Sequence, residues 1–207
     1  MVAKLFDHWK FRISGTIVEF LEFPDDRLGE MKYMFRVDYF GGKYTIDLSQ
    51  TEYNHLSTVV KSGTDCRVFG DILQSNGRPR LRNTDLEISG IKTDMKPIND
   101  EERMLGGYFE GCGELVSKRE YLTKSGVRYQ VSVRSIGGIV ELLVDEQIYQ
   151  KLPAKGLFMV VGRLTSTLER SFVSGKVRIQ SQLEYDTQQM ILVDVNGIVI
   201  NNAKKSA

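Results

Sequence analysis

Alternating hydrophobic and polar residues at the start of the chain predict a three-stranded antiparallel sheet. Residues 11–20 and 33–39 each alternate apolar with polar or small side chains, which is the period of a half-buried strand. Gly41-Gly42 follows the second segment, and glycine reaches the positive φ angles that a tight hairpin turn requires. Residues 43–48 alternate again and are predicted to form the return strand of that hairpin.

The period then changes from that of a strand to that of a helix. Ser49 and Glu52 have the spacing of a capping box, in which each side chain bonds the backbone of the other residue. Apolar residues recur at helical spacing as far as Val60, so one short helix is predicted here. Two more strands are predicted over residues 67–73 and 78–88, on either side of a glycine-containing turn.

The same pattern occurs a second time further along the chain. Residues 131–144 repeat the pattern of residues 35–48, including the central Gly-Gly pair. A second helix is predicted over residues 146–152, followed by strands at 157–164 and 175–185 with a longer loop between them. A repeat of about 80 residues indicates a duplicated domain, because solenoid units are shorter, at about 20–50 residues.

The repeat divides the chain into four predicted parts. The first copy covers residues 9–90, a linker with one helical turn covers 91–107, and the second copy covers 108–186. Residues 187–207 form a C-terminal hairpin and tail, because Asn196-Gly197 is a hairpin-turn signal between aliphatic residues. Glycines in the first and fourth strands suit strands that bend sharply around a small barrel. These glycines are Gly15 and Gly70 in the first copy, and Gly113 and Gly162 in the second.

Three strands, a helix and two strands in about 80 residues is the element order of the OB-fold, a five-stranded Greek-key barrel. The sequence therefore predicts an all-β protein with short helices, built from two tandem OB-folds and a C-terminal β-hairpin. The chain also resembles the single-stranded-DNA-binding protein family in its tandem, two-domain form. This resemblance spans residues 11–186 and rests on the glycine-containing first and fourth strands, the Gly-Gly hairpin and the helix.

The resemblance implies a function and an assembly. The implied function is sequence-nonspecific binding of single-stranded DNA in replication, repair or recombination. The implied assembly is a homodimer that brings four OB-folds together. The predicted partner is thus single-stranded nucleic acid, with DNA favoured over RNA, and no small-molecule cofactor is expected.

Composition and charge limit this prediction only moderately. The chain is 41% hydrophobic and 27% charged, which is ordinary for a globular protein, and no apolar run reaches the ~20 residues that span a membrane. We expect a cytosolic protein, associated with the nucleoid if the source is bacterial. The net charge of +1 is not that of a strongly basic protein. It divides into −1 for residues 9–90 and +2 for residues 108–186, so we expect the second copy to bind a polyanion more strongly.

No sequence motif indicates an enzyme. The chain has no phosphate-binding lysine loop, no dinucleotide-binding glycine run after a strand, and no zinc-ligand spacing. Cys66 and Cys112 are predicted to be buried thiols, because neither belongs to a paired or metal-binding spacing. We therefore predict a non-enzymatic protein without a metal.

Candidate binding residues follow from the face on which an OB-fold binds its ligand. Oligonucleotides bind along the outer face of strands two and three and the flanking loops. Phe35 and Val37 align with Val131 and Val133, so these positions are predicted to face the core and their neighbours the outside. Cations there would contact phosphates and aromatic rings would stack on bases. The predicted binding residues are Arg36, Phe40, Lys43, Phe69, Arg78, Arg80, Arg82, Lys118, Arg119, Tyr121, Lys124, Arg128, Arg134, Arg170, Phe172, Lys176 and Arg178.

Structural interpretations of these residues remain open. Alternating arginines on a strand also fit an ordinary solvated face, Phe69 could pack beneath the helix, and Phe40 could cap the barrel. Tyr121 and Phe172 are placed in polar loops, where a binding role is favoured. Trp9 is predicted to seal a barrel end. The alternative function is a protein-interaction or assembly module without nucleic-acid binding, which the near-zero net charge and the apolar C-terminal hairpin would also suit.

Overall fold

The structure is a computed structural model of the chain. It describes residues 9–24, 30–39, 42–75, 78–91, 95–136, 138–173, 176–193 and 199–204. Over residues 74–75, 78–79, 105, 167–173, 176–186, 191–193 and 199–204 the description covers the backbone alone.

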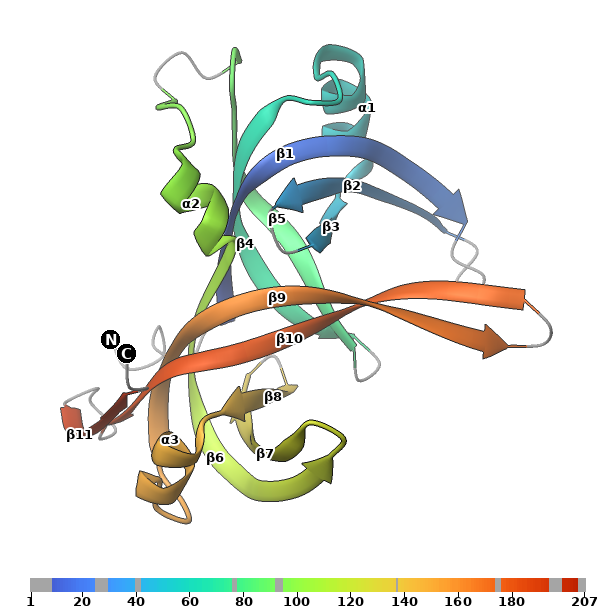
Figure 1. The fold of residues 1–207 in the computed structure, drawn as a ribbon. Coiled ribbons are helices and arrows are strands. Elements are labelled where there is room, and N and C mark those ends of the chain that lie inside the picture. Colours follow the sequence, from blue (N-terminus) through green and yellow to red (C-terminus); the bar gives the residue numbers. More distant parts are fainter. Residues whose placement is uncertain are drawn as a thin grey trace.

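Two successive sets of five strands and one helix make up the chain (Figure 1). The first set contains β1 (Trp9–Pro24), β2 (Met31–Tyr39), β3 (Gly42–Leu48), α1 (Gln50–Val59), β4 (Asp65–Ser75) and β5 (Arg78–Ile88). The short helix α2 (Asp100–Leu105) leads to the second set. This set contains β6 (Gly107–Thr123), β7 (Gly126–Ser135), β8 (Gly138–Val144), α3 (Glu146–Lys151), β9 (Leu157–Val173) and β10 (Lys176–Val193), and β11 (Val199–Lys204) follows it.

Strand pairing closes each set into a barrel. In the first copy β1 pairs with β2 and β4, β2 pairs with β3, and β4 pairs with β5, all antiparallel. A short parallel pairing between Ile46 of β3 and Leu81 of β5 completes the ring. The second copy repeats every one of these pairings, with Asp186 of β10 parallel to Leu143 of β8. This is the Greek-key closure of the OB-fold, so the predicted fold class is confirmed.

A close backbone approach explains the glycine in the first strand of each copy. A Cβ atom on Gly15 would lie 2.3 Å from the carbonyl oxygen of Asp38, and one on Gly113 would lie 2.4 Å from that of Arg134. Just beyond each glycine the strand contains a β-bulge, which inserts one extra residue and changes which side chains face inward. Both copies therefore bend at the same place by the same means.

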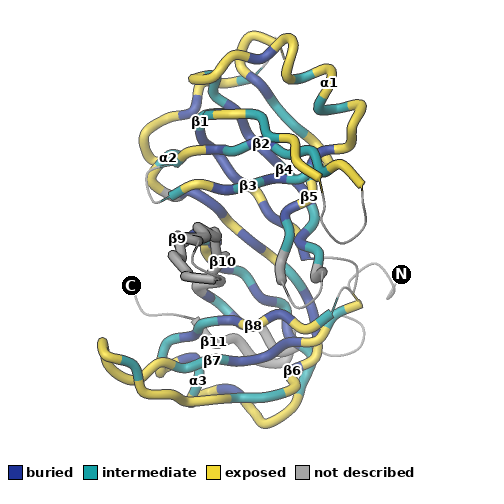
Figure 2. The backbone as a smooth tube through the Cα atoms, turned by 90° about the vertical axis from the view of Figure 1, so that its right-hand side faces the viewer, coloured by how far each residue is buried: buried dark blue, intermediate teal, exposed yellow. Residues whose placement is uncertain are grey.

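The core of each barrel consists of the side chains that strand alternation turns inward. Phe35, Val37, Val131 and Val133 are fully buried, as predicted. Cys66 and Cys112 are buried free thiols, also as predicted. Figure 2 shows buried stretches along the strands of both copies, with α1 and α3 at opposite ends of the molecule.

The first strands of the two copies pair with each other. Phe11 lies opposite Phe109, and these residues occupy corresponding positions in the two copies. Because this antiparallel pairing is centred on corresponding residues, an approximate two-fold axis relates the two barrels. The subunits of a symmetric dimer are related in the same way. Trp9 is fully buried here and stacks on Phe109 with ring centroids 5.9 Å apart. It packs at the joint between the copies, where we had expected it to seal a barrel end.

A second joint connects β9 to the β2–β3 hairpin of the first copy. Tyr39 stacks on the buried Tyr44 with centroids 4.6 Å apart, and the Tyr44 hydroxyl donates to the Leu164 carbonyl. Burial raises the pKa of Tyr44 well above its ordinary value. The Ser166 hydroxyl donates to the Lys43 carbonyl over 2.7 Å. The long ribbon of β9 and β10 thus starts between the two copies and projects outward from there (Figures 1 and 2).

Three predicted segments differ from the structure. The segment 165–174, predicted as a loop, continues β9 as far as Val173, and β10 begins at Lys176. The segment 117–125 around Tyr121 is likewise mostly strand, because β6 extends to Thr123. The C-terminal hairpin exists as β11 pairing with the end of β10, so its first arm is the continuation of the fifth strand. Its predicted turn, Asn196-Gly197, lies outside the described residues.

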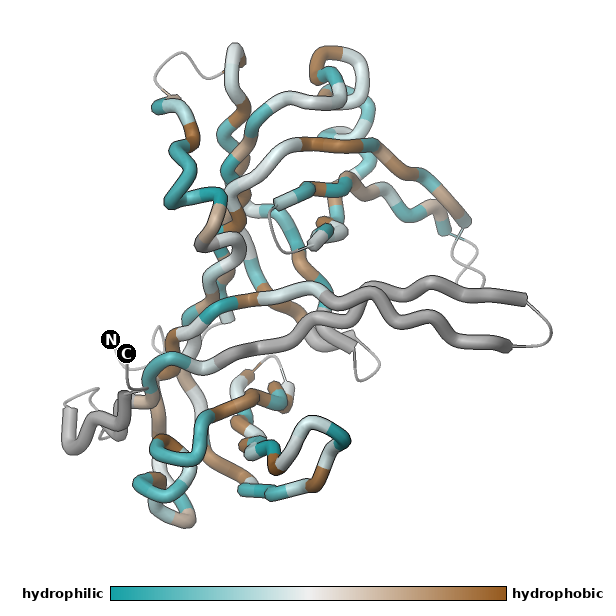
Figure 3. The backbone as a smooth tube through the Cα atoms, in the orientation of Figure 1, coloured by the Kyte–Doolittle hydropathy of each residue, from teal (hydrophilic) through white to brown (hydrophobic). Residues whose placement is uncertain are grey.

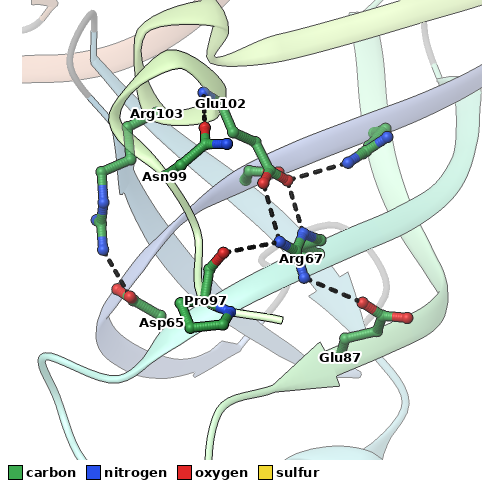
Figure 4. Close-up of polar contacts among 9 residues, drawn as sticks. Asp65, Arg67, Glu87, Pro97, Asn99, Glu102 and Arg103 are labelled. Atoms are coloured by element: carbon green, nitrogen blue, oxygen red, sulfur yellow. Dashed lines mark hydrogen bonds and ion pairs between the residues drawn. The ribbon is translucent and has the colours of Figure 1, made fainter. Parts of the chain in front are cut away.

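Helix α2 is bound to the first copy through Glu102 (Figure 4). This carboxylate accepts two hydrogen bonds from Arg67, at 2.6 and 2.9 Å, and others from Ser14 at 2.6 Å and Arg12 at 3.0 Å. The hydrogen bonds from Arg67 lower the pKa of Glu102 to about 2. Arg67 also lies 3.6 Å from Glu87 of β5. These contacts hold α2 against β1 and β4.

Replacing Glu102 by Gln should destabilise the fold by about 1–3 kcal/mol at neutral pH, because the ion pair with Arg67 loses its charge. The pKa of Glu102 is lower in the folded state, so its contribution is complete above the ordinary value of 4.5 and disappears as pH falls toward 2. Urea unfolding at pH 7 and pH 3 measures this difference. It should shrink at pH 3, and the exposed neighbour substitution E101Q should have little effect at either pH.

Candidate nucleic-acid interface

Each barrel has an outer face on strands one to three, opposite its core. We call them the first and second outer faces. The residues of each face are identified from the strand register, because directly paired residues point to the same side of a sheet. The first consists of Glu19, Leu21, Phe23, Lys32, Met34, Arg36, Asp38, Lys43, Thr45 and Asp47. The second consists of Glu114, Ser117, Arg119, Tyr121, Arg128, Gln130, Ser132, Arg134, Ile139, Glu141 and Leu143.

Three exposed arginines dominate the second outer face. Arg119, Arg128 and Arg134 form no ion pair with any residue that the structure describes. Two acids lie on this face. Glu114 is directly opposite Arg134 in the β6–β7 pairing, and Glu141 accepts a hydrogen bond from the Gln130 amide over 2.8 Å. Arg119 lies opposite Gln130 and Arg128 opposite Tyr121, so within the described residues these two guanidinium groups are available to contact an anion. Sequence reasoning predicted all three, and the register brings them onto one surface.

An exposed aromatic ring lies beside a cation at the far end of each outer face. Tyr121 is directly opposite Arg128 in the β6–β7 pairing and is 38% exposed. At the corresponding position of the first copy, Phe23 is opposite Lys32 and is 41% exposed. Hydrophobic residues continue to the far end of β1 in Figure 3. Our sequence reasoning missed Phe23, and aligning it with Tyr121 in the repeat would have found it.

The first outer face carries cations that are paired with acids. Arg36 forms an ion pair with Glu19 over 2.7 Å. Arg80, which reaches this face from β5, forms one with Asp47 over 2.7 Å. Lys43 lies directly opposite Asp38 in the β2–β3 pairing. Arg82 is exposed on β5 and lies opposite Asp47 and Asp71 in the two ladders that it joins.

Lys118 lies away from the second outer face. It is paired with the buried Val131, so its side chain faces the helix side of the sheet. Its ammonium donates to the carbonyls of Tyr149 and Leu152, at 2.7 and 2.9 Å, and lies 4.4 Å from the Tyr149 ring centroid. A cation that satisfies the last carbonyls of a helix stabilises that helix. Lys118 is therefore bound to the end of α3, because the bulge in β6 inverts the expected alternation.

The remaining predicted residues are divided between described and undescribed positions. Phe69 is half-buried on β4, where the Arg12 guanidinium lies 5.7 Å from its ring centroid, so it is separate from the first outer face. Lys124 is exposed in the turn between β6 and β7. Phe40 lies outside the described residues. Arg78, Arg170, Phe172, Lys176 and Arg178 lie on strands whose side chains are not described there.

Other kinds of site are absent from the described part of the chain. It contains no group of three or more His, Cys, Asp or Glu side chains placed to hold a metal ion. Its helices are all too short or too polar to cross a lipid bilayer.

The fold is that of a known DNA-binding protein, although the sequence alone matches nothing. No known protein family and no curated protein match the sequence. The solved structure of the single-stranded DNA binding protein from Thermus aquaticus has a TM-score of 0.53 to this chain at 12% identity. The match covers 97% of this chain and 94% of that one. A deletion mutant of the same protein matches with a TM-score of 0.51 at 13% identity, covering 97% and 95%.

The neighbours Lys118 and Arg119 should respond differently to substitution. We expect Lys118→Gln to destabilise the protein by about 1–2 kcal/mol, because the carbonyls at the end of α3 lose their charged donor. Arg119→Gln should leave the free energy of unfolding within about 0.5 kcal/mol of the original value, as is usual for an exposed residue without partners. Urea unfolding of both variants measures this. Equal losses would mean that the alternation in β6 has been assigned wrongly.

Proposed function

We propose that this protein binds single-stranded DNA without sequence preference. The observation that carries the proposal is the second outer face, where Arg119 and Arg128 flank the exposed Tyr121 and Arg134 lies further along β7. None of the three forms an ion pair with a residue that the structure describes. Arginines that contact phosphates release condensed counterions, which provides affinity that is independent of sequence. An aromatic face stacks on any unpaired base, at roughly 1–3 kcal/mol per base. The arrangement therefore suits a flexible strand with accessible bases.

The fold supports this proposal, because the Thermus aquaticus protein that it matches is named for binding single-stranded DNA. OB-folds bind about 4–16 nucleotides each, so the two copies provide room for a strand of moderate length. We also propose, as expectations from the resemblance, a role in replication, repair or recombination and assembly as a homodimer.

Exposed aliphatic side chains favour a second candidate function, an assembly module without nucleic-acid binding. Leu122 is 82% exposed and lies directly opposite Val127, which is 47% exposed, at the end of the β6–β7 hairpin. Isolated exposed aliphatic residues are common, whereas grouped ones mark protein contacts. Deleting residues 190–207 separates the two functions. Loss of oligomers with intact DNA binding supports the first function, and absence of DNA binding in the full chain supports the second.

Binding to oligo-dT should weaken steeply as salt increases. Each phosphate contact to a single strand contributes about −0.7 to the slope of log affinity against log salt, so three free arginines predict a slope of about −2 or steeper. Fluorescence anisotropy of labelled oligo-dT at several salt concentrations measures this slope. The same sequence as a duplex serves as the control and should bind more weakly. Affinity that does not change with salt would contradict the proposal.

The aromatic rings at the hairpin ends should contribute through stacking. We expect Tyr121→Ala to lower affinity by roughly 5- to 150-fold, which corresponds to about 1–3 kcal/mol for one stacked base. Tyr121→Phe should retain most of the affinity, because the ring remains. Tyr108 is exposed on the same strand outside the outer face, so Tyr108→Ala serves as the matched control. If Tyr121→Ala and Tyr108→Ala bind alike, the ring of Tyr121 does not touch a base.

A further inference from the structure

The acids that neutralise the first outer face have no counterparts on the second. Corresponding positions are fixed by the ladders, because both first strands contain a bulge at the same place relative to their partners. The corresponding residues are Ser117 for Glu19, Arg134 for Asp38 and Leu143 for Asp47. The two copies share a backbone pattern and differ in the charges that they display.

We propose that Glu19 and Asp47 take the place of phosphate on the first outer face and so direct single-stranded DNA to the second. This inference rests on the proposed function. It makes these two acids specificity-determining residues, because they decide which of two similar barrels holds the strand. It also predicts that the chain has one strong and one weak binding face.

The geometry of the ion pairs supports this role. The carboxylates of Glu19 and Asp47 each lie 2.7 Å from a guanidinium, where a phosphate oxygen would otherwise be held. A phosphate that approaches Arg36 or Arg80 also meets the neighbouring negative charge, so its net attraction is small. On the second outer face Arg119 lies opposite Gln130 and Arg128 opposite Tyr121, and neither forms an ion pair with a described residue. Glu114 is opposite Arg134 without forming an ion pair with it, so a phosphate meets less competition here than on the first outer face.

Glu19 is well suited to substitution, because the side chains of Arg36 and Glu19 are 42% and 43% exposed and exposed ion pairs contribute little to folding stability. The side chains of Arg80 and Asp47 are 35% and 20% exposed, so we expect a larger stability cost at Asp47 than at Glu19. Glu19→Gln and Asp47→Asn keep the shape of each side chain and remove its charge. The double variant E19Q/D47N therefore frees two cations without a large change in the fold, which thermal unfolding can verify.

We expect E19Q/D47N to bind oligo-dT about tenfold or more tightly than the natural chain at about 50 mM salt, and its salt slope to steepen by up to about 1.4. Anisotropy titrations with labelled oligo-dT measure both quantities. E19Q and D47N alone should each give about half of the change in slope. If one variant fails to fold, the other still tests the proposal.

The double variant D100N/E101Q is the matched control. It adds the same charge on exposed residues of α2, away from both outer faces. The control should leave the slope close to that of the natural chain. If E19Q/D47N and D100N/E101Q behave alike, bulk charge explains the effect and the inference is overturned. If the natural chain does not bind oligo-dT at all, the proposed function itself fails, which is a different result.

Discussion

The antiparallel pairing of β1 with β6 fixes how the two barrels are placed relative to each other. Backbone hydrogen bonds around Phe11 and Phe109 continue one sheet across both copies, and Trp9 fills the space beside them. The hydroxyls of Tyr44 and Ser166 form a second joint, so relative rotation of the copies would break hydrogen bonds at two places. Because the copies cannot turn independently, their outer faces keep a constant position relative to each other.

Each barrel keeps its shape through contacts that leave its outer face free to change. The glycine in each first strand is required by a carbonyl 2.3–2.4 Å from where a Cβ would lie, and the inward residues are required by packing. The residues of the two outer faces, apart from Ser132, are half-buried or exposed. Charge substitutions there cost little stability, because exposed ion pairs contribute about 0–1 kcal/mol. A duplicated barrel can therefore change its ligand preference without changing its fold.

The sequence predicted those parts of the fold that depend on local order. Burial of Phe35 and Val37 follows from a period of two, and the cap at Ser49 follows from residues three positions apart, so both could be recognised from neighbouring residues. The partner of Trp9 could not be predicted, because it depends on pairing between strands that are far apart in the chain. The ribbon beyond residue 165 resembles a loop in composition, because a projecting two-stranded ribbon needs no continuous hydrophobic pattern.

The positions of the candidate site residues also depend partly on local sequence and partly on contacts between distant strands. Arg128 and Arg134 were predicted from alternation within a strand and Arg119 as part of a loop, and the structure places all three on one face. Lys118 was predicted with them and faces the other way. The reason is the bulge beyond Gly113, where the close approach of a distant strand shifts the alternation by one residue. The extra residue in the bulge thus places Arg119 on the outer face and turns Lys118 toward the end of α3.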